Sequence, residues 1–178
     1  MFSQSLNFLK KLKRTFFPFY KNEDLKFIFK KLQDGIPKER VAARFVGGCV
    51  RKHLSNEKID DIDIATILST DQIREKFRDT SVKIIDTGIK HGTVTLISDK
   101  HKIELTTLRK DIKTDGRHAE VEYIDDWEQD SERRDFTINA IYLDINGKIF
   151  DPQMGKVDLK NNIVKFIGDP QKRIEEDY

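Results

Sequence analysis

Two aspartates separated by one residue, Asp61 and Asp63, are the side chains of this sequence best suited to hold a metal ion. In an extended segment, side chains at positions i and i+2 point to the same face, so both carboxylates would aim at one spot. Carboxylates that close repel each other and raise each other's pKa unless a cation lies between them. The cation that suits one or two carboxylates together with substrate phosphates is Mg²⁺. The pair therefore predicts a magnesium site.

A Gly-Gly step, Gly47-Gly48, precedes this pair at a point where a strand over 44–46 is expected to turn into a short helix over 49–54. Glycine lets the backbone approach an anion closely, and the free N–H groups at a helix start bind phosphate. Each motif alone is weak, because an isolated Asp-x-Asp or Gly-Gly is usually just a turn. Together, and in this order, they indicate phosphoryl or nucleotidyl transfer.

A third carboxylate is expected nearby, from Glu104 in a strand over 102–108. Ile103 and Leu105 flank it, so Glu104 faces away from the apolar side. An acid in mid-strand usually faces solvent. Here it could join the aspartates, since two Mg²⁺ ions roughly 4 Å apart would need about three acids.

The run Arg133-Arg134-Asp135 is the second notable segment, and it is expected to lie on a helix over 131–141. On that helix the side chains of Arg134, Asp135 and Asn139 are spaced to converge. The planar guanidinium of arginine suits phosphate, whereas Asp and Asn suit ribose hydroxyls. Such a run is usually a surface salt-bridge cluster, but beside the other motifs it is interpreted as a nucleotide grip.

The composition indicates a soluble globular protein of one domain, or of one domain and a fragment of another. The chain has 178 residues, 37% hydrophobic and 36% charged, and its net charge of +2 excludes a generic nucleic-acid-coating protein. Residues 1–40 are basic, and 6–16 could form an amphipathic helix that packs on its own domain, a membrane or RNA. The single cysteine, Cys49, excludes an internal disulfide, predicts a cytoplasmic protein and is interpreted as a packing residue. No segment reads as a signal peptide or a membrane span.

The hydrophobic pattern predicts a mixture of helices and strands, with a long mobile loop over 110–130, where eleven of twenty-one residues are charged. Helices are expected over 24–33, 70–78 and from 171 onwards, and strands over 59–67, 82–86, 93–98 and 163–167. A hairpin is expected at 142–150, with a two-residue turn at Asn146-Gly147.

Five ordered motifs carry a family resemblance: Val46–Arg51, Asp61–Thr66, Glu104–Arg109, Asp115–Arg117 and Arg133–Ala140. With Asp151-Pro152 and Gly168-Asp169-Pro170 further on, residues 44–178 resemble the amino-terminal part of class II tRNA nucleotidyltransferases (CCA-adding enzymes) and bacterial poly(A) polymerases. The resemblance implies an α+β fold of the DNA polymerase β-like type, with a mixed, mostly antiparallel sheet. It also implies three parts: a basic helical extension (1–40), a catalytic head (41–150) and the start of a neck (151–178).

The resemblance also implies roles for individual residues. Asp61, Asp63 and Glu104 would bind Mg²⁺ and carry catalysis. Gly47, Gly48, Arg51, Arg134, Asp135, Asn139 and Asp177 would bind the incoming nucleotide. The segment 110–130 would be the family's flexible loop. The implied substrates are ATP, CTP and the 3′ end of tRNA.

Two departures from the family pattern keep alternatives open. Lys52 stands where the family usually has Asp, and the arginine expected to follow Asp177 in the base-reading helix is not in this chain. We therefore expect a missing C-terminal part, a partner polypeptide or a homo-oligomer. CCA addition, CC-only addition, poly(A) addition and a non-catalytic RNA-binding remnant all remain possible.

Overall fold

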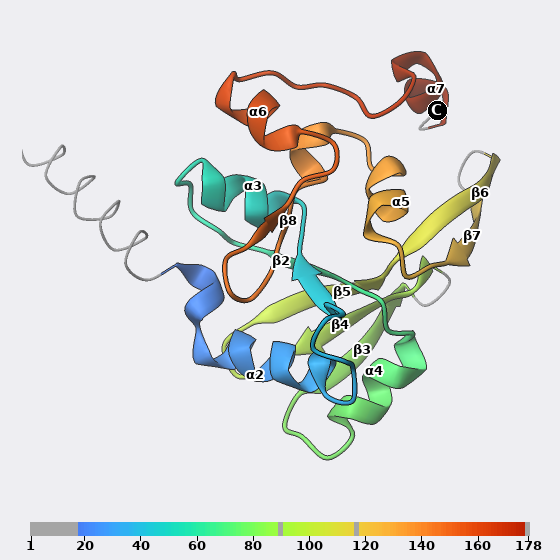
Figure 1. The fold of residues 1–178 in the computed structure, drawn as a ribbon. Coiled ribbons are helices and arrows are strands. Elements are labelled where there is room, and N and C mark those ends of the chain that lie inside the picture. Colours follow the sequence, from blue (N-terminus) through green and yellow to red (C-terminus); the bar gives the residue numbers. More distant parts are fainter. Residues whose placement is uncertain (1–17, 89–90, 116–117, 177–178) are drawn as a thin grey trace, which may run out of the picture.

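The computed structural model describes residues 18–88, 91–115 and 118–176, and in this part of the chain seven strands form one sheet in the order β3-β4-β5-β2-β1-β8-β9 (Figure 1). The strands are β1 (Ala43–Phe45), β2 (Ile62–Thr66), β3 (Lys83–Gly88), β4 (Thr93–Ile97), β5 (Lys102–Thr107), β8 (Tyr142–Leu143) and β9 (Ile149–Phe150). All neighbours are antiparallel except β2 and β5, which are parallel. The expected α+β fold with a mixed, mostly antiparallel sheet is confirmed.

Helices surround this sheet, and a separate hairpin of β6 (Arg109–Asp115) and β7 (His118–Tyr123) projects from it (Figure 1). The α-helices are α2 (Glu23–Gln33), α3 (Gly48–Leu54), α4 (Thr70–Phe77), α5 (Trp127–Glu132), α6 (Gly155–Lys160) and α7 (Pro170–Glu176), and the 3-10 turns are η1 (Phe19–Lys21) and η3 (Thr137–Asn139). No helix among the described residues is long and apolar enough to cross a membrane.

Helix α2 packs its apolar stripe into the core of the sheet. Leu25, Ile28, Phe29 and Leu32 recur at helical spacing, and all four are buried. Burial of each such side chain contributes roughly 1.5–3 kcal/mol. The Asn22 side chain accepts a hydrogen bond from the backbone N–H of Asp24 and so caps the helix. The predicted boundaries at 1–40, 41–150 and 151–178 stay predictions.

The loop predicted over 110–130 is wrong, because most of this segment is the antiparallel β6–β7 hairpin and the start of α5. The pairing runs from Arg109 opposite Tyr123 to Asp115 opposite His118, with an irregularity between Asp111 and Lys113. Ile112 and Tyr123 are both about half exposed. The sequence did hold a strand signal here, because Ala119, Val121 and Tyr123 alternate with Glu120 and Glu122, but the high charge of the segment favoured a loop.

The helix predicted over 131–141 is also wrong. Helix α5 ends at Glu132, and Phe136 is extended with φ −123° and ψ 143°. Its ring packs on Phe166, with centroids 4.6 Å apart, and the two residues form an isolated β-bridge. That bridge replaces the strand predicted over 163–167 and breaks the helical register before η3.

The β8–β9 hairpin is confirmed, although its turn is one residue longer than predicted. The Asp144 N–H donates to the Lys148 carbonyl at 3.0 Å, which leaves residues 145–147 in the turn. Gly147 takes φ +85°, a conformation that favours glycine. The predicted amphipathic helix at 6–16 lies outside the described residues.

Close backbone approach at Gly155 brings α6 against η3. A Cβ at this position would lie 2.0 Å from the carbonyl oxygen of Thr137, an atom that cannot move without shifting η3. The Thr137 hydroxyl also donates to the Asp158 carboxylate at 2.7 Å, which fastens the same two elements. The position of Asn139, at the end of η3, therefore depends on Gly155.

We expect Gly155→Ala to lower the free energy of unfolding by about 1–3 kcal/mol, the usual cost of overpacking. The matched control is Gly48→Ala, because a Cβ at Gly48 would meet no atom within 4 Å. Urea denaturation followed by circular dichroism measures both variants. Equal stabilities would contradict the close approach of α6 and η3.

Candidate active site

The parallel pairing of β2 with β5 sets two acidic side chains next to each other. In its register, Asp63 lies opposite Glu104 on the neighbouring strand. Asp61 immediately precedes β2, and all three acids line one pocket of about 280 Å³. The structure thus brings together the three carboxylates that the sequence singled out.

Electrostatic strain is concentrated on Asp63. Burial raises the pKa of its carboxyl above the usual value, and the negative charges of Glu104 and Asp61 raise it further. Arg134 and Lys52 act in the opposite direction without cancelling the rise. Carboxylate oxygens that repel one another in this way match the donor type that Mg²⁺ prefers. Among the described residues, no group of three acidic, His or Cys side chains is close enough to enclose a metal ion unaided.

The Gly47-Gly48 step brings the start of α3 against Asp63. Gly47 takes φ +72°, and a Cβ there would lie 3.4 Å from Oδ2 of Asp63. The Val46 N–H donates to the Asp63 carbonyl at 3.0 Å, which fixes the turn beside β2. The backbone of this turn is therefore open toward the carboxylates, as the phosphate-cradle interpretation requires.

Arginines line a second pocket, of about 290 Å³, that shares Asp63 and Glu104 with the first. They are Arg109, Arg133 and Arg134. Of these, the sequence had singled out only Arg134 as a site residue. Arg109 follows the Glu104 strand directly, and that position was the available signal for it.

A buried aspartate, Asp130, holds two of these arginines and was missed from the sequence. Its carboxylate is 0% exposed and lies 2.9 Å from Nη2 of Arg133 and 3.0 Å from Nη2 of Arg134. The Tyr142 hydroxyl donates to it at 2.7 Å. Burial alone would raise the pKa of Asp130, but Arg134 and Arg133 outweigh it and hold the pKa below the ordinary value. The spacing of Asp130 three and four residues before the arginines was the signal in the sequence.

The remaining predicted nucleotide-binding residues do not come together at one point of the structure. Asn139 accepts a hydrogen bond from the Arg51 guanidinium, which joins η3 to α3. Arg134 turns instead toward Asp130, so the expected convergence of Arg134 and Asn139 on one helix is wrong. Asp135 is exposed, and Asp177 lies outside the described residues.

Lys52, the departure from the family pattern, lies on α3 beside the acidic pocket. Its ammonium group is 3.5 Å from the Asp60 carboxylate. It also lowers the pKa of Asp63, although less than Arg134 does. Its charge therefore acts on the carboxylate cluster.

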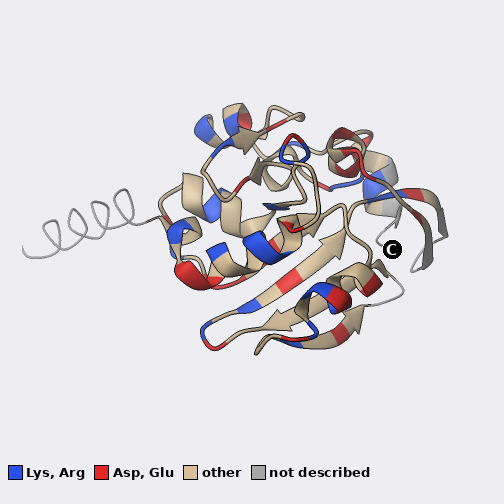
Figure 2. Ribbon diagram, turned by 60° about the horizontal axis from the view of Figure 1, so that its bottom comes forward, with Lys and Arg blue, Asp and Glu red and all other residues tan. Residues whose placement is uncertain are grey.

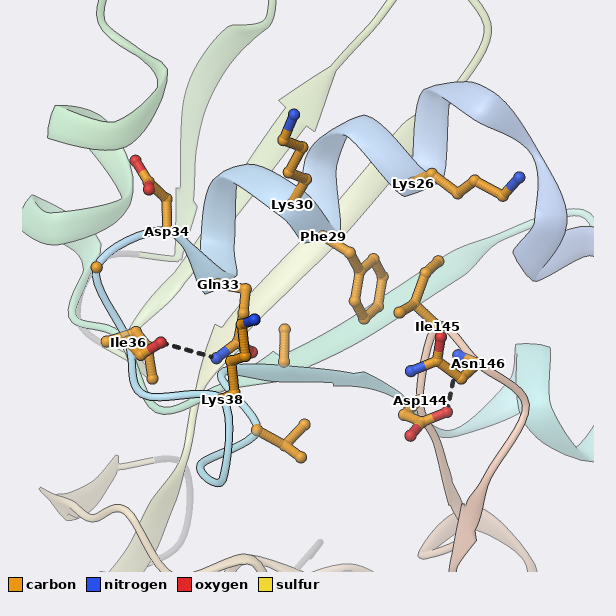
Figure 3. Close-up of a pocket in the computed structure, with 13 residues that line it drawn as sticks. Lys26, Phe29, Lys30, Gln33, Asp34, Ile36, Lys38, Asp144, Ile145 and Asn146 are labelled. Carbon is orange, nitrogen blue, oxygen red and sulfur yellow. Dashed lines mark hydrogen bonds between the residues drawn. The ribbon is translucent and has the colours of Figure 1, made fainter.

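Basic and acidic residues are interspersed along the ribbon, as Figure 2 shows. Another pocket, of about 610 Å³, lies away from Asp61, Asp63 and Glu104, between α2 and the β8–β9 turn (Figure 3). Phe29, Ile36 and Ile145 contribute to its apolar lining, and Lys26 and Lys30 of α2 also line it (Figure 3). The groups suited to chemistry are thus at the β2–β5 pockets.

A protein-family comparison matches residues 43–165 to the Poly A polymerase head domain. The chain belongs to this family. The mitochondrial CCA tRNA nucleotidyltransferase 1 of Mus musculus is 45% identical over 150 residues, which is 84% of this chain and 35% of the relative. The CCA-adding enzyme of Lactobacillus helveticus is 42% identical over 137 residues, 76% of this chain and 33% of the relative. The chain thus spans about a third of the length of these curated relatives.

Solved structures of CCA-adding enzymes and tRNA nucleotidyltransferases also resemble this chain. The CCA-adding enzyme of Bacillus stearothermophilus in complex with CTP superposes with a TM-score of 0.74 at 35% identity, covering 88% of this chain and 36% of the other. A tRNA nucleotidyltransferase complexed with a primer tRNA and an incoming ATP analog gives a TM-score of 0.60 at 29% identity, covering 75% and 37%. Both relatives share the head described above.

Cys49 is a packing residue rather than a nucleophile. It is 1% exposed, and its thiol donates to the Val46 carbonyl at 3.2 Å. Burial raises the pKa of this thiol to about 11. We expect no reaction with iodoacetamide at pH 8 in native protein and full reaction in urea, measured by mass spectrometry. Rapid native labelling would contradict the burial.

We expect Asp63→Asn to stabilise the metal-free protein. Because folding raises the pKa of the Asp63 carboxyl above its unfolded value, the stability that this group contributes falls as pH rises through its folded pKa. The variant removes the cost of ionising the buried Asp63 carboxyl, so its free energy of unfolding should depend less on pH. Denaturation in EDTA between pH 4 and pH 8 measures the effect, and a less stable variant at pH 8 would count against repulsion at Asp63.

Proposed function

We propose that this protein is a magnesium-dependent, template-independent nucleotidyltransferase that adds CMP and AMP from CTP and ATP to the 3′ end of tRNA. The single observation that carries the proposal is the placement of Asp63 opposite Glu104, with Asp61 in the same pocket. Family membership and the names of the relatives support it. We further propose that it acts in the cytoplasm, where its one cysteine stays a free thiol.

In the proposed reaction, the 3′-hydroxyl oxygen of the RNA forms a bond to the α-phosphorus of the nucleotide. The bond from that phosphorus to the bridging oxygen breaks, pyrophosphate leaves and the hydroxyl proton passes to solvent. Asp61, Asp63 and Glu104 would hold Mg²⁺, which neutralises phosphate charge when bound. The Asp63 and Glu104 carboxylates would be stabilised by the ion that relieves their repulsion.

The nucleotide would lie between this cluster and the basic groups around it. The Gly47-Gly48 turn and Arg51 would contact the triphosphate. Arg134 would contact the nucleotide from the arginine pocket, with Asn139 orienting Arg51. Asp135 and Asp177 are further proposed contacts of the nucleotide.

We propose that further polypeptide, joined or separate, packs on the 154–174 segment to complete the enzyme. Five apolar side chains there are 47–66% exposed: Met154, Val157, Ile163, Val164 and Ile174. Exposed apolar surface of this kind marks contact sites. The matched part of this chain covers only about a third of each relative, so the relatives contain additional polypeptide that could cover such a surface.

The test is incubation with Mg²⁺, labelled CTP or ATP, and tRNA lacking its 3′ CCA, with and without a C-terminal polypeptide from a relative. We expect incorporation with that polypeptide, reduced by on the order of 10²-fold or more in Asp61→Ala and Asp63→Ala. Asp71→Ala, an exposed acid on α4, is the control. A wild-type protein that neither incorporates nor binds nucleotide would indicate a non-catalytic RNA-binding remnant.

The second candidate is poly(A) or CC-only addition, which uses the same chemistry. Poly(A) addition is a candidate because the matched family is described as the Poly A polymerase head domain. Product length separates the three activities: two nucleotides from CTP alone, a third from ATP, or a long tract from ATP. Sequencing of the extended RNA reads this directly.

A further inference from the structure

We propose that Asp130 is the positioning residue of the nucleotide pocket: it holds the guanidinium groups of Arg133 and Arg134 together, facing the carboxylates on β2 and β5. This inference rests on the proposed function, because it concerns how the arginines are presented to a nucleoside triphosphate. Asp130 itself does not touch the substrate, because its carboxylate is 0% exposed.

Every face of the Asp130 carboxylate is occupied by a donor. Oδ1 accepts from Nε of Arg133 at 2.9 Å and from the backbone N–H of Arg109 at 3.2 Å. Oδ2 accepts from Nη2 of Arg134 at 3.0 Å and from the Tyr142 hydroxyl at 2.7 Å. No acceptor position remains for a metal ion or a substrate, so the carboxylate can act only through the groups that it holds.

The arginines, by contrast, keep donors available. The Arg133 side chain is 15% exposed and that of Arg134 is 16% exposed, and both line the pocket that contains Asp63 and Glu104. Each uses Nε and Nη2 for the contacts described. Among the described residues, Nη1 of each arginine has no partner. One edge of each guanidinium therefore faces the pocket, which suits phosphate oxygens.

Without the Asp130 carboxylate, the guanidinium groups of Arg133 and Arg134 would move apart. Two adjacent guanidinium groups repel in a poorly solvated site, and Arg109 adds a third positive charge to the same pocket. Consecutive residues do not normally point to one spot. Here they do so because Asp130 lies three residues before one and four before the other. Tyr142 fixes the arrangement, since its hydroxyl accepts from Nε of Arg134 at 3.1 Å while it donates to Asp130.

Removing the Asp130 charge distinguishes positioning from simple electrostatics, because the two predict opposite changes in affinity. Asp130→Asn removes a negative charge from a pocket proposed to bind an anion, so electrostatics alone would strengthen nucleotide binding. Positioning predicts weaker binding, on the order of 10- to 100-fold as for other residues that orient a binding group. The conservative variant Tyr142→Phe, which loses only the hydroxyl, should weaken binding by roughly two- to ten-fold.

The experiment measures the dissociation constants of Mg²⁺–CTP and Mg²⁺–ATP by calorimetry, with melting temperatures recorded for every variant. Asp125→Asn is the matched control, because it makes the same charge change at an exposed residue that pairs with Arg40. We expect Asp125→Asn to bind as the wild type does. In an Arg133→Gln, Arg134→Gln background, Asp130→Asn should cause no further loss, because a residue that acts through the arginines has nothing left to position.

A structural readout keeps the test independent of nucleotide binding. In ¹⁵N spectra, the Nε–H groups of Arg133 and Arg134 should exchange slowly with water in the wild type and rapidly in Asp130→Asn. If Asp130→Asn binds CTP as tightly as the wild type or more tightly, the positioning role of Asp130 is wrong, whereas the proposed function still stands. The same holds for an equal loss in the background without the arginines, or for fast exchange in the wild type. A wild type that binds no CTP overturns the proposed function and, with it, the role of Asp130 in nucleotide binding.

Discussion

The parallel pairing of β2 with β5 is the constraint on which the site depends. Every other neighbouring pair in the sheet is antiparallel, and this one alone sets Asp63 beside Glu104. The hydrogen-bonded ladder holds the two carboxylates together against their repulsion, and burial together with that repulsion raises the pKa of Asp63. The stability of the surrounding core compensates for the cost of that repulsion, as stored strain at functional sites generally requires.

The basic half of the site follows a different physical rule. Its charges are gathered by opposite charge, because the buried Asp130 collects Arg133 and Arg134 at one wall of the pocket. Backbone geometry thus arranges the acids, and side-chain electrostatics arranges the bases. The two halves meet at the pocket that Asp63 shares with the arginines.

Local patterns in the sequence were sufficient to predict the helices that bury one face against the core. The stripe from Leu25 to Leu32 predicted α2, and the helix predicted over 70–78 is α4, which the structure begins with a capping box of Ser69 and Gln72. The β6–β7 hairpin was not predicted, because the many charged residues of its sequence are typical of a loop. The end of α5 depends on Phe136 meeting Phe166, a contact between residues thirty positions apart that no local window contains.

The same division holds for the site. Spacing identified Asp61, Asp63 and Glu104, because alternation along a strand fixes which face each side chain takes. Alternation does not say which strands are neighbours, so the pairing of Asp63 with Glu104 became visible only in the fold. The partner of Asn139 was likewise beyond reach, since Arg51 lies on another element, whereas Arg134 turns toward Asp130, only four residues before it.

The order of strands also determines when the sheet is complete as the chain is synthesised. Strand β1 lies between β2 and β8, and its contact with β8 joins Phe45 to Leu143. Until β8 leaves the ribosome, one edge of β1 is bare, and a bare edge is a template for pairing with another chain. In the finished sheet the two edge strands are poor templates for such pairing, because β9 is only two residues long and β3 is interrupted between Ile85 and Gly88. The bare edge of β1 is therefore a hazard of aggregation while the chain is being synthesised.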